Sequence, residues 1–229
     1  MTEPAPRSPE RTAPPPREWY GRDALSVARD LLGAYLTTDD DEGRVTLRLT
    51  EVEAYQGARD PASHAYRGRT ARNAAMFAEA GHLYVYRHLG LHHCVNVVCG
   101  PTGEAAAVLL RAGEIVAGAE LARERRTRSG VAADDVQLAR GPARLAVALG
   151  LDLRRYGADV TRAGGAVVVH RGPDPAPPAV GTGPRVGVSG PGADAELFPW
   201  RLWLPGEPTV SAYRPGYRRR PAGSRTART

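Results

Sequence analysis

Arg44-Val-Thr-Leu-Arg-Leu-Thr50 begins the stretch that decides the fold, and Glu51-Val-Glu-Ala-Tyr55 continues it. The first seven residues alternate polar and apolar side chains, which is the pattern of a half-buried β-strand. If the pleat continues unbroken, Glu51 and Glu53 share the parity of the apolar residues and are carried inward. A buried carboxylate is costly unless it is paired or used. The stretch therefore predicts a functional site or, as the alternative, a strand end whose carboxylates point to water.

The strand is expected to end at Gly57, Asp60 and Pro61, which disfavour continued sheet pairing. Glu53 and Tyr55 then lie where a strand opens into a loop. Chemistry is often found at such positions, because a rigid element holds the residues while the loop leaves them accessible.

The rest of the chain predicts one α+β domain. Helices are predicted over residues 24–36, 114–126 and 141–150, an acidic turn over 37–43, and strands over 83–86, 92–99, 105–111, 165–171, 185–188 and 201–204. Strands dominate the middle without a regular βαβ alternation, which favours a curved, mainly antiparallel sheet flanked by helices. Residues 1–17 and the basic residues 214–229 are predicted to be disordered tails on a domain that spans 18–213.

The charge favours a polyanionic partner. The formal net charge is +6, the isoelectric point is near 9.7, and all basic side chains other than histidine are arginine. Arginine binds phosphate in a bidentate way that lysine cannot match, although coding bias is an alternative explanation for the arginine content. Without lysine, no side-chain amine can form a Schiff base with a sugar.

Other function classes are disfavoured. No apolar run reaches the roughly 18 residues that span a bilayer, and no signal peptide is evident, so we expect a cytoplasmic protein without a membrane partner. Cys94 and Cys99 lie on one predicted strand, which suits reduced thiols. His88 and His92 could join them in a metal site, but the spacing matches no usual zinc pattern. We therefore expect no metal and no cofactor.

Two surface features suit nucleic acid. Arginines are concentrated in the loop of residues 67–75, which predicts phosphate contacts or, alternatively, ordinary solvated surface. The connection between strands 83–86 and 92–99 places the apolar Leu89 at a hairpin tip. Tyr84 and Tyr86 alternate along the first of these strands, so they share a face where one could stack on a flat ligand while the other packs in the core.

A series of motifs carries a resemblance to a known family. They are Thr50-Glu-Val-Glu-Ala-Tyr55, His64, Arg72-Asn73, Met76-Phe77, Gly81-His-Leu-Tyr-Val-Tyr86, Asn96, Leu109-Leu-Arg111, Gly141-Pro142 and Arg185-Val-Gly-Val188. In this order, and over roughly residues 20–212, the chain resembles the alkyladenine (3-methyladenine) DNA glycosylase family.

The resemblance implies a monomeric, monofunctional DNA glycosylase of base excision repair. Such an enzyme flips an alkylated or deaminated purine out of double-stranded DNA, hydrolyses its N-glycosidic bond and leaves an abasic site. When bound to DNA, it would be associated with the nucleoid. The implied catalytic residues are Glu53 as the general base, with Arg111 and the Val186 carbonyl holding the water. The implied base-binding residues are Tyr55, His64, Tyr86 and Asn96, and the implied wedge into DNA is Leu89. From the residues themselves we also expect DNA contacts by Tyr84 and by the loop arginines Arg67, Arg69 and Arg72. Leu89 occupies the position of the family's usual wedge tyrosine.

The chemistry of the residues is consistent with this resemblance. A carboxylate near the sugar can stabilise an oxocarbenium-like transition state and activate water. Aromatic faces attract a positively charged alkylated purine, and the absence of lysine excludes a lysine-based lyase. Two alternatives remain open at this point: a basic nucleic-acid-binding protein without catalysis, and a small-molecule nucleosidase.

Overall fold

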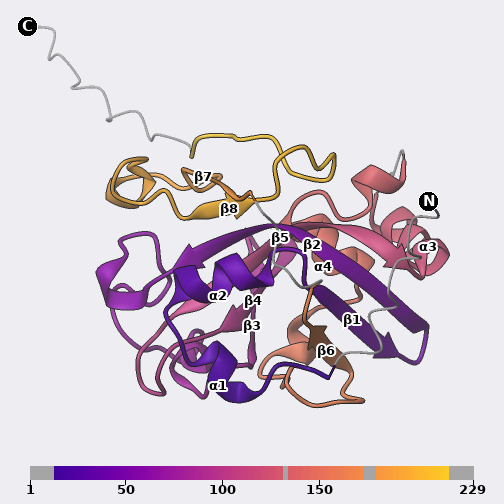
Figure 1. The fold of residues 1–229 in the computed structure, drawn as a ribbon, viewed down its shortest axis with the longest axis horizontal. Coiled ribbons are helices and arrows are strands. Elements are labelled where there is room, and N and C mark those ends of the chain that lie inside the picture. Colours follow the sequence, from indigo (N-terminus) through magenta and orange to yellow (C-terminus); the bar gives the residue numbers. More distant parts are fainter. Residues whose placement is uncertain (1–12, 131–133, 173–178, 217–229) are drawn as a thin grey trace, which may run out of the picture.

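The computed structural model describes residues 13–130, 134–172 and 179–216. Within these residues the strands form one mainly antiparallel, curved sheet with the order β3-β4-β5-β2-β1-β6, while β8 pairs with β2 and β7 (Figure 1). Helices flank the sheet, so the predicted α+β class with a single curved sheet is confirmed.

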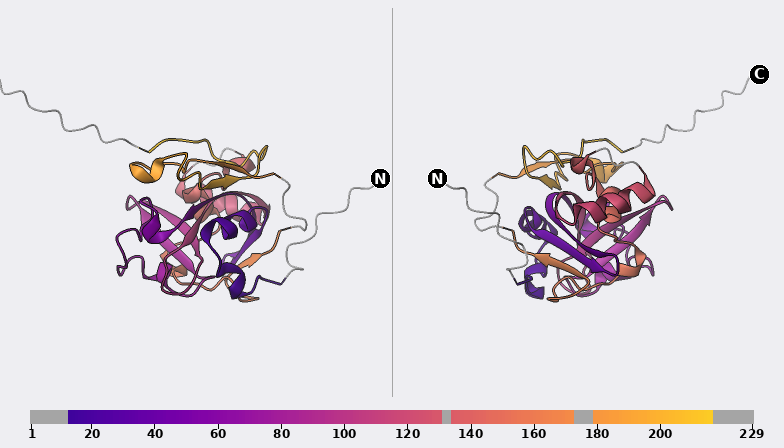
Figure 2. Two further views of the ribbon diagram at one scale, coloured as in Figure 1. Left: turned by 60° about the vertical axis from the view of Figure 1, so that its left-hand side comes forward. Right: turned by 90° about the vertical axis from the view of Figure 1, so that its right-hand side faces the viewer.

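The strands are β1 Tyr35–Asp40, β2 Gly43–Tyr55, β3 Leu83–His88, β4 His92–Val98, β5 Ala107–Ala117, β6 Val167–His170, β7 Gly181–Gly183 and β8 Arg201–Trp203. The α-helices are α1 Arg17–Tyr20, α2 Ala24–Leu31, α3 Ala119–Ser129 and α4 Pro142–Ala148. Short 3-10 helices cover Gly57–Arg59, Ala74–Phe77, Asp135–Gln137, Leu153–Arg155 and Pro191–Ala193. The late segment with β7 and β8, orange to yellow, lies along one side of the rest of the molecule in both views of Figure 2.

β2 is the central strand, and a β-bulge within it determines which way its carboxylates face. Leu49 pairs with Gly113 of β5, but Glu51 already pairs with Ala112, so Thr50 is an extra residue on β2. An extra residue reverses the alternation of a strand. Before the bulge the core contains Val45, Leu47 and Leu49; after it, the core contains Val52 and Ala54.

Glu51 and Glu53 are therefore on the opposite face of β2 from the main core. Both are fully buried, so the prediction that they leave the solvent is confirmed and the alternative of a water-exposed strand end is wrong. The predicted reason, an unbroken pleat that carries them to the core face, is also wrong. The bulge buries them against a second surface, where they meet Arg111 of β5.

The first predicted helix is too long. α2 begins after Asp23, whose carboxylate caps the N–H groups of Leu25 and Ser26, and it ends at Leu31. Gly33 then turns the chain with φ +79°, and most of the predicted acidic turn forms β1, which pairs with β2. Tyr35 and Leu36 continue the helical spacing of apolar residues in the sequence, but in the structure they begin β1.

Two other predicted elements differ from the structure, one in its start and one in its type. The helix predicted over 114–126 starts later, because β5 continues to Ala117 beside β2 and α3 begins only after Gly118, which has φ +74°. The strand predicted over 185–188 is a turn. The predicted hairpin of β3 and β4, the helix α4 and the strands β6 and β8 are confirmed, within a few residues at their ends.

The predicted tails fall largely outside the described residues, which begin at residue 13 and end at 216. Arg17, at the end of the predicted N-terminal tail, begins α1 and pairs with Asp159 at 2.7 Å. The domain boundaries at 18 and 213 stay a prediction. In the part of the chain that the structure describes, no helix is long and apolar enough to cross a membrane.

Candidate active site

A cavity of about 330 Å³ opens on the face of β2 that carries Glu53. Its walls come from the ends of β2 and β5, from β3 and β4, and from the loop of residues 186–189. Every predicted catalytic and base-binding residue lines it, namely Glu53, Tyr55, His64, Tyr86, Asn96, Arg111 and Val186, and so does Tyr84. Leu89, Arg67, Arg69 and Arg72 do not line it.

Glu53 is held by three donors. Its Oε1 atom accepts a hydrogen bond from the Val186 N–H at 2.6 Å and lies 3.2 Å from Arg111 Nη1. Its Oε2 atom accepts from the Tyr55 hydroxyl at 2.8 Å. Burial, and next the charge of Glu53, raise the pKa of Tyr55 well above its usual value, so the hydroxyl keeps its proton and can donate. The geometry fixes one carboxylate at the cavity wall.

Arg111 links this carboxylate to a second one. It lies on β5 at a second register shift and is only 5% exposed. Its Nε atom donates to Glu51 at 2.8 Å while Nη1 faces Glu53. Burial alone would lower the pKa of Arg111, but the charges of Glu53 and Glu51 outweigh that effect and raise it. Arg111 is therefore a fixed cation in the cavity wall.

Aromatic rings form another wall of the cavity. The rings of His64 and Tyr86 lie edge to face with centroids 4.5 Å apart, and Tyr84 stacks behind Tyr86 at 5.6 Å. The Tyr84 hydroxyl lies 3.0 Å from His64 Nδ1. Partial desolvation, and then the charges of Arg72 and His88, lower the pKa of His64, which favours the neutral imidazole. Tyr84 is 1% exposed, so in this structure it supports the other two rings and offers almost no surface to DNA.

Tyr55 is backed by a buried cation that the sequence reasoning missed. The Arg185 guanidinium lies 4.6 Å from the centroid of the Tyr55 ring and pairs with both oxygens of Asp60, at 2.6 and 2.7 Å. It also donates to the Ala54 carbonyl. The sequence pattern gives Arg185 no role of its own and marks Asp60 only as a strand-breaking residue. Both side chains are fully buried, which fixes the Tyr55 ring from behind.

The hairpin of β3 and β4 presents its tip to solvent. Leu89 is 81% exposed and has φ +50°, a conformation that strains any residue other than glycine, and Gly90 follows with φ +70°. Leu91 is also exposed. At the base of the hairpin, the buried Asn96 donates through Nδ2 to the Tyr84 carbonyl at 3.0 Å and lines the cavity. One hairpin thus carries both the strained apolar tip and part of the cavity wall.

The predicted basic loop borders this hairpin. Arg67, Arg69 and Arg72 are all exposed. Arg72 donates to the Arg87 carbonyl at 3.3 Å, and its guanidinium lies 5.8 Å from the centroid of the Tyr86 ring. This loop therefore brings positive charge to the side of the cavity where the hairpin emerges.

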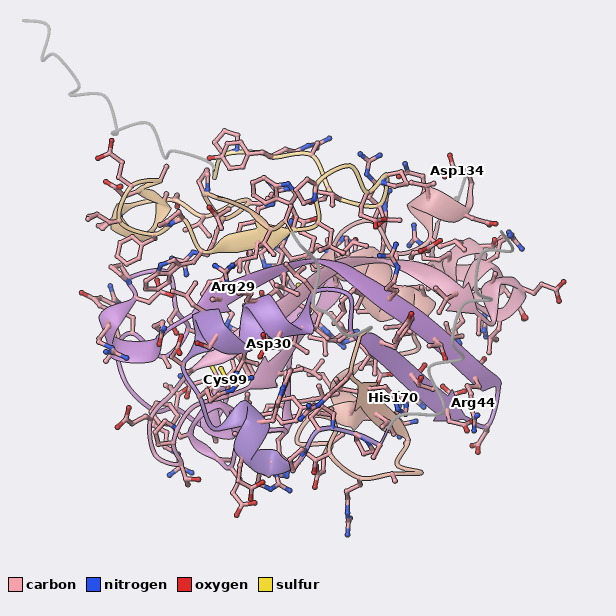
Figure 3. The ribbon with its side chains drawn as sticks, viewed as in Figure 1. Arg29, Asp30, Arg44, Cys99, Asp134 and His170 are labelled. Carbon is pink, nitrogen blue, oxygen red and sulfur yellow. The ribbon has the colours of Figure 1, made fainter. Side chains whose placement is uncertain are left out.

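The histidines and cysteines do not gather into a metal site. Among the described residues, no group of three or more His, Cys, Asp or Glu side chains could hold a metal ion. His88 and His92 pair across the hairpin, and Cys94 is a free thiol that lines the cavity. Cys99 is free as well and lies in the core cluster that includes residues of α2, next to which it is labelled in Figure 3.

The fold and the cavity define a protein whose curved sheet carries a pocket lined by aromatic side chains and by a buried carboxylate–arginine pair. Residues 18–208 match a family model described as "Methylpurine-DNA glycosylase (MPG)". The chain belongs to this methylpurine-DNA glycosylase family, whose members are DNA-binding hydrolases of base excision repair.

Relatives extend the match over nearly the full length. A protein of Streptomyces avermitilis is 53% identical over 208 residues, which cover 90% of this chain and 94% of the relative. A protein of Leifsonia xyli is 52% identical over 204 residues, covering 88% and 93% of the two chains. A protein of Methanocella arvoryzae is 43% identical over 201 residues, covering 88% and 97%. Each relative bears the name "Putative 3-methyladenine DNA glycosylase".

Proposed function

We propose that the protein is a monofunctional DNA glycosylase that flips alkylated or deaminated purines out of duplex DNA and hydrolyses the N-glycosidic bond. The observation that carries this proposal is Glu53, a fully buried carboxylate that lines an aromatic cavity and faces a fixed arginine. The enzyme acts as a monomer on DNA with a damaged purine, meets that DNA on the nucleoid and leaves an abasic site.

Glu53 performs the chemistry in this proposal. Cleavage of a glycosidic bond develops positive charge on the sugar, which a nearby carboxylate stabilises. The same carboxylate accepts a proton from the attacking water as a general base. Arg111 and the Val186 carbonyl hold that water, while the Val186 N–H, which donates to Glu53, keeps the carboxylate in place.

The cavity is suited to a single base. Its volume of about 330 Å³ is at the lower end of small-ligand sites, which span roughly 300–1,000 Å³. Tyr55 contacts one face of the flipped base, and His64 with Tyr86 contacts the other. An alkylated purine that carries positive charge is attracted to these rings by cation–π interaction. Asn96 excludes the exocyclic amine of guanine.

The test is whether strand cleavage depends on alkali. Duplexes that contain a single 1,N6-ethenoadenine or hypoxanthine are incubated with the protein and divided into two portions. We expect intact strands in the untreated portion and cleavage at the lesion in the alkali-treated portion, because hydrolysis leaves an abasic site and the chain contains no lysine for a lyase step. Cleavage without alkali would contradict a monofunctional reaction.

The loop arginines should determine part of the salt dependence of DNA binding. If Arg72 contacts a phosphate, Arg72→Gln should reduce the slope of log affinity against log salt by about one unit without changing lesion preference. The measurement is a binding titration at several salt concentrations. Arg29→Gln is the matched control, because Arg29 is exposed on α2, which packs on the core face of the sheet. An unchanged slope for Arg72→Gln would exclude this contact.

The hairpin tip should matter on duplex DNA only. Extruding a base costs a few kcal/mol of stacking and pairing, and an inserted side chain recovers part of it. We expect Leu89→Ala to slow single-turnover excision about tenfold on duplex DNA and far less on single strands, and Leu89→Tyr to raise duplex affinity. Val116→Ala, which truncates an exposed residue near the far end of β5, is the control. Equal losses on both substrates would mean that Leu89 supports the fold instead.

A further inference from the structure

The proposed mechanism leaves one buried carboxylate, Glu51, without a role. Glu51 is fully buried, and its two oxygens accept four hydrogen bonds. Oε1 accepts from Arg111 Nε at 2.8 Å, Arg201 Nε at 2.7 Å and the Ser211 hydroxyl at 2.9 Å. Oε2 accepts from the Ser211 N–H at 2.7 Å. A buried carboxylate with so complete a set of donors fixes the groups around it.

Arg111 is shared between Glu51 and the catalytic carboxylate. Its Nε atom is engaged by Glu51, and this leaves Nη1 to face Glu53 at 3.2 Å. Glu51, Glu53, Arg111 and Arg201 together form a buried set of two carboxylates and two guanidinium groups. Burial alone would raise the pKa of Glu51, but Arg111, the Ser211 N–H and Arg201 outweigh burial and lower it, so Glu51 carries its charge.

Ser211 comes from a segment beyond the family match, which ends at residue 208. Besides its two bonds to Glu51, its hydroxyl accepts from Arg111 Nη2 at 3.3 Å, and its carbonyl accepts from Arg201 Nη2 at 2.5 Å. The buried Thr209 hydroxyl lies 2.8 Å from that of Thr50, the bulge residue of β2. The segment of residues 209–211 thus packs over Thr50 and Glu51 of β2.

We propose that Glu51, held by Ser211, is a positioning residue that fixes Arg111 through Nε and shares its charge, so that Arg111 steers Glu53 and the water without neutralising the catalytic carboxylate. This inference rests on the proposed glycosylase function and assigns a role to Glu51, Arg201 and Ser211 within it. Glu51 touches neither the base nor the water; it acts through Arg111.

A positioning role of this kind has a signature in the separation of chemistry from binding. Without the Glu51 charge, Arg111 is compensated by Glu53 alone and neutralises more of the carboxylate that must accept a proton from water. Base release should therefore slow while duplex affinity stays native.

The experiment measures single-turnover base release from a hypoxanthine duplex at saturating protein, together with duplex affinity. Glu51→Gln keeps an acceptor for Arg111 but loses the charge. We expect a rate at least ~10-fold lower and unchanged affinity. Glu207→Gln is the matched control, because Glu207 pairs with Arg48 on the same protein but contacts none of the four charged groups; it should behave like the native enzyme.

Ser211→Ala provides the second variant if Glu51→Gln does not fold. It removes the hydroxyl that donates to Glu51 at 2.9 Å and accepts from Arg111 at 3.3 Å but keeps the backbone N–H. We expect base release to slow by at least about 2–10-fold, the scale of one net hydrogen bond. A folded Glu51→Gln protein with the native rate, or with a slower rate matched by an equal loss of affinity, would overturn the inference, as would native behaviour of Ser211→Ala. If the native protein itself releases no base, the proposed function fails instead, so the two failures are distinguishable.

Discussion

Glu53→Gln should bind a lesion-containing duplex with native affinity and release the base at least ~100-fold more slowly, the usual scale for loss of a general base. The substitution keeps the size of the side chain, and its amide oxygen can still accept from the Val186 N–H. An amide cannot take a proton from water, and it offers no full negative charge to the sugar in the transition state. The variant should therefore keep its affinity for the duplex while losing base release.

The measurement is single-turnover base release at saturating protein, with affinity measured in parallel. Glu79→Gln is the control, since Glu79 is an exposed glutamate whose nearest ion-pair contact is Arg17 at 3.6 Å. Release by Glu53→Gln at the native rate would show that Glu53 is a structural carboxylate and that the proposed mechanism is wrong.

Asp60→Asn should reduce the free energy of unfolding by about 3–5 kcal/mol, because it leaves a buried cation without its countercharge. Arg185 has no exposed side-chain surface and pairs with both oxygens of Asp60. The same change loosens the support behind Tyr55, so base binding should weaken as well.

Denaturant unfolding gives the comparison. Asp152→Asn removes the partner of Arg154 in an ion pair whose arginine is 84% exposed, and surface pairs of this kind contribute only about 0–1 kcal/mol. If Asp60→Asn and Asp152→Asn reduce the free energy of unfolding by the same small amount, the Asp60–Arg185 pair does not hold this part of the site together.

The sequence predicted those parts of the fold that local patterns control. The alternation in β2, the hairpin of β3 and β4, and the Pro142-to-Gly150 helix signals all identified real elements. The errors arose where pairing with distant residues outweighed local composition. β1 was predicted as helix and turn because its apolar residues continue the spacing of α2, yet it pairs with β2 and β6. The bulge at Thr50 has no signal in a single sequence.

The candidate site was predictable only in part, and for a similar reason. The motifs identified residues that line the cavity, of which Glu53, Tyr55, Tyr86, Asn96 and Arg111 lie on strands and His64 and Val186 lie in turns. The support behind them was missed. Glu51 is bound by Arg201 and Ser211, which lie 150 and 160 positions away, and Asp60 is bound by Arg185, 125 positions away. Only the folded chain brings these charges together, so neither spacing nor composition could reveal the pairs.

The most direct test of the account is the detection of free base. The native protein is incubated with three substrates: a duplex that contains one hypoxanthine, the same duplex undamaged, and the free nucleoside inosine. The soluble products are separated and measured. Release of hypoxanthine from the damaged duplex, with none from the undamaged duplex and little from the nucleoside, is the predicted result. Binding of the damaged duplex without release, or release from the nucleoside alone, would contradict a DNA glycosylase.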